Sequence, residues 1–172
     1  MNSEFHATDL FALSGTIYLL AVSYRLAVID IREHRLPNRL VLPAFPISIA
    51  GHLVSCTLSN NWTNLLSALG CSLLALVTGL AANRWASLGM GDVKLIGAIA
   101  LGLGWFSFLA PLIAVVLAFV FACAVVLVMV ALRKTSLRSS FALGPYLLSG
   151  FALTQILTWS TYFGGFSPNF FM

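Results

Sequence analysis

Charged residues are scarce in this chain. Asp, Glu, Lys and Arg make up 8% of the 172 residues, and 60% of the residues are hydrophobic. An ordinary soluble domain carries about 25% charged residues, so this composition excludes a soluble protein with a solvated surface. It predicts an all-α integral membrane protein. The length allows a bundle of about six transmembrane helices, because each needs about 20 residues to cross a hydrocarbon core of about 30 Å.

Residues that would build a disulfide framework, a metal site or a signal peptide are also lacking. Cys56, Cys71 and Cys123 are widely spaced without a C-x-x-C pair, so we interpret them as packing residues. His52 has no partner at metal-ligand spacing and is interpreted as a packed histidine. We therefore expect no metal and no cofactor. The first ten residues contain no Lys or Arg, so the first apolar segment is expected to remain in the mature protein.

Apolar runs separated by short polar connections predict a single polytopic membrane domain over residues 1–172. The expected spans are 10–29, 40–57, 65–82, 92–104, 107–132 and 141–162. Residues 93–132 are nearly all apolar over twice the length of one span, so the chain must fold back within them. Gly102, Gly104 and Trp105 predict the turn, with Pro111 as the alternative.

The basic residues predict the orientation. With six spans and connections on alternating sides, all nine Lys and Arg residues fall at one membrane face. The positive-inside rule makes that face cytoplasmic, so both termini are predicted to lie outside. We therefore attribute the excess of basic charge to membrane topology. We expect a lipid bilayer as a partner and no nucleic acid. The sequence does not indicate an oligomeric state.

The stretch Gly89-Met90-Gly91-Asp92-Val93-Lys94 places a carboxylate directly before an apolar segment. Ionisable residues in membrane segments are costly and are usually functional. The alternative is that Asp92 only caps a helix. The predicted topology brings Asp30, at the end of the first span, to the same membrane face as Asp92. Two carboxylates that meet share a proton, which is how aspartic proteases obtain an acid and a base, so we predict a catalytic dyad.

The predicted helix ends suggest separate roles for the two carboxylates. A helix N-terminus at Asp92 favours the anion, and a helix C-terminus at Asp30 disfavours it. Our hypothesis is that Asp92 is the base that takes a proton from water and that Asp30 is the acid that protonates the scissile carbonyl. Coupled groups titrate as a pair, so their pKa values belong to the pair and do not assign the two roles.

These residues, in this order, resemble the prepilin peptidase family of membrane aspartic peptidases. The resemblance is carried by Asp30, the following Leu36-Pro37-Asn38-Arg39 and the G-x-G-D motif that ends at Asp92. The stretch Ala142-Leu143-Gly144-Pro145-Tyr146 is similar to the Gly-Pro element of that family. The resemblance implies that Asp30 and Asp92 are the catalytic aspartates.

The same resemblance implies a substrate and a location. Members of the family remove the basic leader of type IV pilin or pseudopilin precursors at the cytoplasmic face of the bacterial inner membrane. This chain lacks the extended loop with paired C-x-x-C motifs that accompanies N-methylation in larger members. It therefore resembles a short, peptidase-only form, of the type that serves Flp or tight-adherence pili.

Four residues of the polar segments are candidate supporting or substrate-binding residues, each with a simpler alternative. Lys94 is expected to orient Asp92 or a substrate carbonyl, or to be a charge that only sets topology. Glu33 is expected to help position substrate, or to lie in a solvated loop. Asn38 is expected to form a hydrogen bond near the first aspartate, or to end the turn that Pro37 introduces.

Gly89 and Gly91 are the remaining candidates. Glycine reaches backbone conformations that are closed to other residues, and such conformations would let an extended substrate pair with this segment. The alternative is a plain loop between two helices.

Two other functions compete with a peptidase. One is a transporter or proton relay through Asp30 and Asp92, since intramembrane acids often conduct protons. A relay would need further acids or histidines through the membrane depth, and the middle parts of the third, fifth and sixth predicted spans contain none. The other is a non-catalytic scaffold for pilus assembly.

Overall fold

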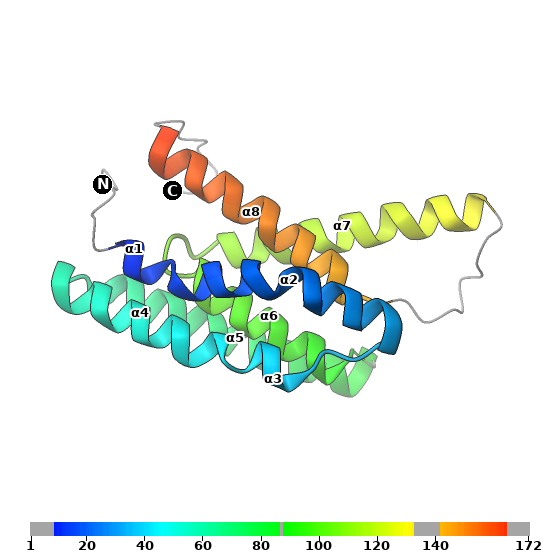
Figure 1. The fold of residues 1–172 in the computed structure, drawn as a ribbon, viewed down its shortest axis with the longest axis horizontal. Coiled ribbons are helices and arrows are strands. Elements are labelled where there is room, and N and C mark those ends of the chain that lie inside the picture. Colours follow the sequence, from blue (N-terminus) through cyan, green and yellow to red (C-terminus); the bar gives the residue numbers. More distant parts are fainter. Residues whose placement is uncertain (1–8, 87, 133–141, 165–172) are drawn as a thin grey trace.

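The computed structural model describes residues 9–86, 88–132 and 142–164, and these residues form helices and short connections without a strand. The helices are α1 (Asp9–Ala12), α2 (Ser14–Glu33), α3 (Asn38–Val41), α4 (Ala44–Ser59), α5 (Trp62–Ala86), α6 (Met90–Leu103), α7 (Ala110–Ala131) and α8 (Gly144–Gly164). The longer helices run beside one another along the long axis of the molecule, and α7 extends past the others at one end (Figure 1). The predicted all-α class is confirmed.

Four helical segments of the described chain are long and apolar enough to cross a membrane. They are Leu10–Glu33, Asn38–Ser59, Trp62–Ala86 and Ala110–Ala131. The predicted membrane protein is therefore confirmed, whereas the count of six spans and the outside location of the termini remain predictions. Helix α6 is not among the four. Its 14 residues measure about 21 Å at 1.5 Å per residue, short of a core of about 30 Å.

Glycine and proline set several of the helix boundaries. Pro37 has φ −70° and ψ 124° directly before α3, so the chain is extended there and turns into a helix at the next residue. The apolar stretch after Asp92 folds back just after α6, which ends at Leu103, so the turn lies at Gly104, as the glycines predict. The predicted start of the last span at 141 and the basic segment before it lie outside the described residues.

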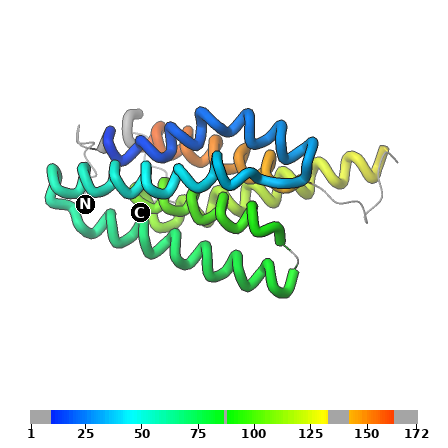
Figure 2. Tube along the Cα trace, turned by 60° about the horizontal axis from the view of Figure 1, so that its bottom comes forward, coloured from blue at the N-terminus to red at the C-terminus, as the bar shows by residue number. Residues whose placement is uncertain are grey.

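Helix α6 is the centre of the bundle. Val93, Leu95 and all residues from 97 to 103 are buried. The helix packs most extensively against α5, and it also contacts α2, α3, α4, α7 and α8. Figure 2 shows α6 between α5 and the pair formed by α2 and α8. This helix of 14 residues is thus held by protein on most sides.

Hydrogen bonds from neighbouring helices fix α6 along its length. Ser72 Oγ of α5 donates to the carbonyl oxygen of Gly97 at 3.0 Å. His52 Nε2 of α4 lies 3.0 Å from the carbonyl oxygen of Leu101, one of the last carbonyls of α6. The His52 ring is buried and stacks on Trp105, with centroids 4.8 Å apart. The interpretation of His52 as a packed histidine is confirmed.

The three cysteines do not share one role. Cys56 and Cys71 are buried, as expected for packing residues, but Cys123 is exposed on α7. The interpretation as a packing residue is therefore wrong for Cys123. The exposed side of α7 is apolar throughout, so a small apolar thiol fits its composition.

Candidate active site

Asp30 lies in the last turn of α2 and is 5% exposed. Helix α2 ends because His34 adopts the left-handed conformation, with φ 50°, and its backbone N–H donates to the carbonyl oxygen of Asp30 at 2.8 Å. The Asp30 carboxylate accepts a hydrogen bond at Oδ2, from the backbone N–H of Gly144 at 2.9 Å. The two residues are 114 positions apart, so the tertiary fold brings the start of α8 onto this carboxylate.

Asp92 is the third residue of α6. The residue at the N-cap is Gly89, and no side chain makes a capping hydrogen bond at this helix end. Asp92 is therefore not the N-cap residue, and it lies in the first turn of the helix, at the positive end of the helix dipole. Asp92 Oδ1 is buried and has no hydrogen-bond partner among the described residues. A buried carboxylate oxygen without a partner is unusual and indicates a functional position.

The two carboxylates interact electrostatically. Asp92 lies outside the four segments that are long and apolar enough to cross a membrane. Burial, and then the negative charge of Asp30, raise the pKa of Asp92 to about 6. The negative charge of one carboxylate thus makes ionisation of the other less favourable. Figure 1 shows the end of α2, the start of α6 and the start of α8 at the same end of the bundle.

The helix ends do not separate the acid from the base. The predicted topology places a helix N-terminus at Asp92 alone, whereas in the structure the N-terminus of α8 donates its first N–H to Asp30. Both carboxylates therefore lie at the positive end of a helix, and this effect no longer separates them. Which aspartate is the base remains a hypothesis.

The two motif glycines provide space, and their backbone freedom is not used. Gly89 has φ −60° and ψ 134°, and Gly91 lies inside α6, so the expectation of a special backbone conformation is wrong. A Cβ atom on Gly89 would lie 2.8 Å from Asp92 Oδ2. A Cβ atom on Gly91 would lie 2.8 Å from Cβ of Leu36, in the segment between α2 and α3. The motif thus makes room for the carboxylate on one side and for a covering segment on the other.

The polar candidates around the dyad have mixed outcomes. Lys94 Nζ donates to Asn38 Oδ1 at 3.0 Å, which links α6 to α3. Among the described residues, Asn38 makes no hydrogen bond to the Asp30 carboxylate, which is bonded by Gly144, and Lys94 makes no ion pair with Asp92. Pro37 starts α3, as described above. Glu33 is exposed as the last residue of α2, in agreement with its solvated alternative.

Comparison with known families now identifies the chain. The profile of the type IV leader peptidase family matches residues 17–131, about two thirds of the chain. The chain belongs to the type IV leader peptidase family. Comparisons with curated proteins and with solved structures find no match. Family membership makes this protein a peptidase, and it favours hydrolysis over the proton-relay and scaffold alternatives.

Sequence reasoning missed the roles of two residues in this leader peptidase. Leu36 is buried against Gly91, although the sequence indicated it only as part of the motif Leu36-Pro37-Asn38-Arg39. Gly144 belongs to the Gly-Pro element, but nothing in the sequence placed its N–H on Asp30. Gly144 also lies beyond the part of the chain that the family profile matches. No local pattern could have revealed either contact, because each depends on how distant segments pack.

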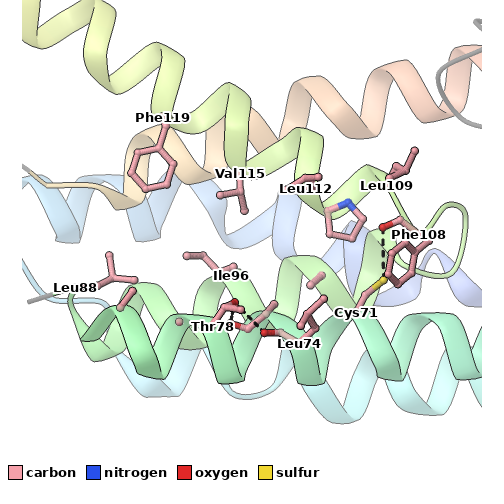
Figure 3. Close-up of a pocket in the computed structure, with 15 residues that line it drawn as sticks. Cys71, Leu74, Thr78, Leu88, Ile96, Phe108, Leu109, Leu112, Val115 and Phe119 are labelled. Carbon is pink, nitrogen blue, oxygen red and sulfur yellow. Dashed lines mark hydrogen bonds between the residues drawn. The ribbon is translucent and has the colours of Figure 1, made fainter. Parts of the chain in front are cut away.

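The leader peptidase also has an apolar cleft of about 410 Å³ between α5 and α7, with α6 behind it. Figure 3 shows Leu74 and Thr78 of α5 facing Val115 and Phe119 of α7, and Leu88 at one end. Neither aspartate lines this cleft, so it is separate from the carboxylates. No group of three His, Cys, Asp or Glu side chains in the described ranges could hold a metal ion.

Proposed function

We propose that this chain is an aspartic endopeptidase that removes the basic N-terminal leader from type IV pilin or pseudopilin precursors. Asp30 and Asp92 act as one acid and one base and activate a water molecule. The observation that carries the proposal is the buried Asp92 of a leader peptidase family member, whose pKa is raised to about 6 by burial and then by the negative charge of Asp30. That pKa lies close to the pH at which general acid–base catalysis operates.

The reaction needs one proton shared by the pair. The ionised carboxylate takes a proton from water as the water oxygen attacks the scissile carbonyl carbon. The protonated carboxyl group gives its proton to the carbonyl oxygen, which forms a neutral tetrahedral intermediate. As the intermediate collapses, the carboxylate that is now ionised takes a proton from one hydroxyl group, the carbonyl re-forms and the C–N bond breaks. The amine leaves with the proton that came from water, so the pair again holds one proton. The unpartnered Asp92 Oδ1 supports this use, because a buried oxygen without an internal donor is available to a water or a substrate group.

The proposed site lies at the cytoplasmic face of the bacterial inner membrane. The support is the distribution of the nine Lys and Arg residues on one predicted face. At that face Glu33 is exposed one turn after Asp30, where its negative charge attracts a basic leader. The lack of an extended loop with paired C-x-x-C motifs supports a peptidase-only enzyme of the Flp or tight-adherence type.

Cleavage of a precursor by purified protein tests the proposal. A full-length pilin precursor is incubated with the enzyme in detergent, and mass spectrometry locates the new N-terminus. Wild type is expected to cut before the apolar helix of the precursor, and Asp30→Asn and Asp92→Asn to lose cleavage. Asp9→Asn is the matched control, because it makes the same chemical change at the start of α1, at the other end of the bundle (Figure 1). Cleavage that survives either dyad substitution contradicts the proposal.

A further inference from the structure

The backbone N–H groups at the start of α8 can be accounted for one by one. Tyr146 and Leu147 each donate to the carbonyl oxygen of Leu143 at 3.1 Å, and Pro145 has no N–H. Gly144 donates at 2.9 Å to Asp30 Oδ2. Among residues 144–147, the Gly144 N–H is therefore the donor that leaves its own helix. It is directed at a residue of the proposed dyad.

The contact is possible because residue 144 has no side chain. A Cβ atom there would lie 2.6 Å from Asp30 Oδ2 and 3.0 Å from its Cγ. Separations below 3.0 Å are not found for real Cβ atoms, so any side chain at this position would push the carboxyl group away. The amide and the carboxylate would then no longer meet at hydrogen-bond distance.

The donor is held in place by the core, independently of the hydrogen bond. Leu147 and Phe151 of α8 are fully buried and belong to the same hydrophobic cluster as Leu19 and Leu26 of α2. Packing between α2 and α8 thus fixes the start of α8 against the last turns of α2. A hydrogen bond from a rigid donor to a carboxylate is short and directional, and it restricts the rotation of the side chain.

We propose that Gly144 is a positioning residue of the peptidase, whose backbone N–H holds the Asp30 carboxylate in the orientation in which it shares a proton with Asp92. The inference rests on the proposed catalytic role of Asp30. Gly144 itself contacts neither water nor substrate in this mechanism, and it acts through the carboxylate. Proton sharing depends on the distance and angle between the two groups, so the loss of this one contact misplaces the dyad while the fold remains.

Gly144→Ala tests the proposal. It is expected to lower kcat on the order of a hundredfold, as for a misplacement of about 1 Å at a catalytic group, and to leave KM near the wild-type value. Its pH–rate profile is expected to move along the pH axis. A mere loss of folded enzyme would lower the profile by the same factor at every pH. Two controls share α8 with Gly144. Pro145→Ala keeps the Gly144 N–H, and Thr158→Ala removes a buried hydroxyl far from Asp30, so neither is expected to move the profile.

If the Gly144→Ala variant does not fold, a second measurement tests the same contact in protein that keeps Gly144. In protein labelled with ¹⁵N-glycine, the Gly144 amide resonance is expected to shift on Asp30→Ala, whereas that of Gly70, which has open space around it, is not. An unmoved Gly144 resonance, or a Gly144→Ala enzyme with wild-type kcat and pH profile, overturns the inference. If Asp30→Asn and Asp92→Asn themselves retain cleavage, the proposed function fails, and this result is distinct from a failure of Gly144 alone.

Discussion

The change Gly89→Ala separates activity from stability in this peptidase. The backbone at Gly89, with φ −60° and ψ 134°, is open to alanine without strain. Replacing glycine at a compatible position stabilises a protein by about 0.4–1 kcal/mol through the unfolded chain. Gly89 is also the N-cap of α6, where alanine is less favourable than glycine, and this offsets part of the gain. The free energy of unfolding should therefore change little.

The effect on the carboxylate is larger. The added Cβ atom would lie 2.8 Å from Asp92 Oδ2, whereas ordinary contacts of this kind begin at 3.4 Å. The carboxyl group must therefore move by about 0.6 Å, and since a 1 Å misplacement costs about a hundredfold in rate, we expect kcat/KM to fall about tenfold or more. The relevant motion is that of a terminal side-chain group, so the rest of α6 can stay in place.

Initial rates of precursor cleavage and thermal unfolding in the same detergent measure both quantities. Gly70→Ala is the matched control, because a Cβ atom at Gly70 meets nothing within 4 Å. In the middle of α5 this control should raise the free energy of unfolding by up to about 1 kcal/mol and leave cleavage unchanged. A Gly89→Ala enzyme as fast as wild type refutes the reasoning. So does a loss of cleavage that is matched by a loss of folded protein.

Three further changes test the surroundings of the dyad. Gly91→Ala places a Cβ atom 2.8 Å from Cβ of Leu36 and should lower the free energy of unfolding by about 1–3 kcal/mol. Leu36→Gly removes the Cβ atom that is met, so it should restore part of this loss in the double variant, and additive losses in thermal unfolding would contradict the contact. His52→Ala removes the hydrogen bond to the Leu101 carbonyl of α6 and the stack on Trp105, so it should lower the free energy of unfolding by about 2–4 kcal/mol. The folded enzyme should keep its kcat. Denaturant unfolding measures this change, and an unchanged free energy of unfolding would show that these two contacts do not stabilise the fold. Asp92, with its pKa raised to about 6, binds more protons when folded than when unfolded between about pH 4 and pH 6, so its burial destabilises the fold once it ionises. Asp92→Asn should therefore raise Tm over wild type at pH 7, and this gain should shrink by pH 5; a gain independent of pH would exclude the raised pKa.

Several parts of the fold follow directly from the sequence. The scarcity of charge predicts a helical membrane protein, and the glycines at 102 and 104 predict where the chain turns back after α6. A short α6 then follows from simple geometry, because few residues separate Asp92 from that turn. These features depend on composition and on local backbone preference, which can be read along the chain.

The surroundings of the dyad do not follow from the sequence. The motif glycines were expected to matter for their backbone, yet Gly89 has an ordinary negative φ, and its role is the space beside Asp92. Lys94 was expected to orient Asp92 or a substrate carbonyl, yet its Nζ donates a hydrogen bond to Asn38 Oδ1. The contact of Gly144 with Asp30 spans 114 residues. Each of these outcomes depends on how distant segments of the chain pack together. The local sequence pattern does not indicate that packing.

The central claim is that Asp30 and Asp92 work as a single unit. Cleavage rates of Asp30→Asn, Asp92→Asn and the double variant, measured with one precursor and equal amounts of folded protein, test it most directly. Residues that act as a unit are strongly non-additive, so the double variant should be no slower than the slower single variant. Losses that multiply in the double variant would show two independent contributions and would contradict a shared-proton dyad.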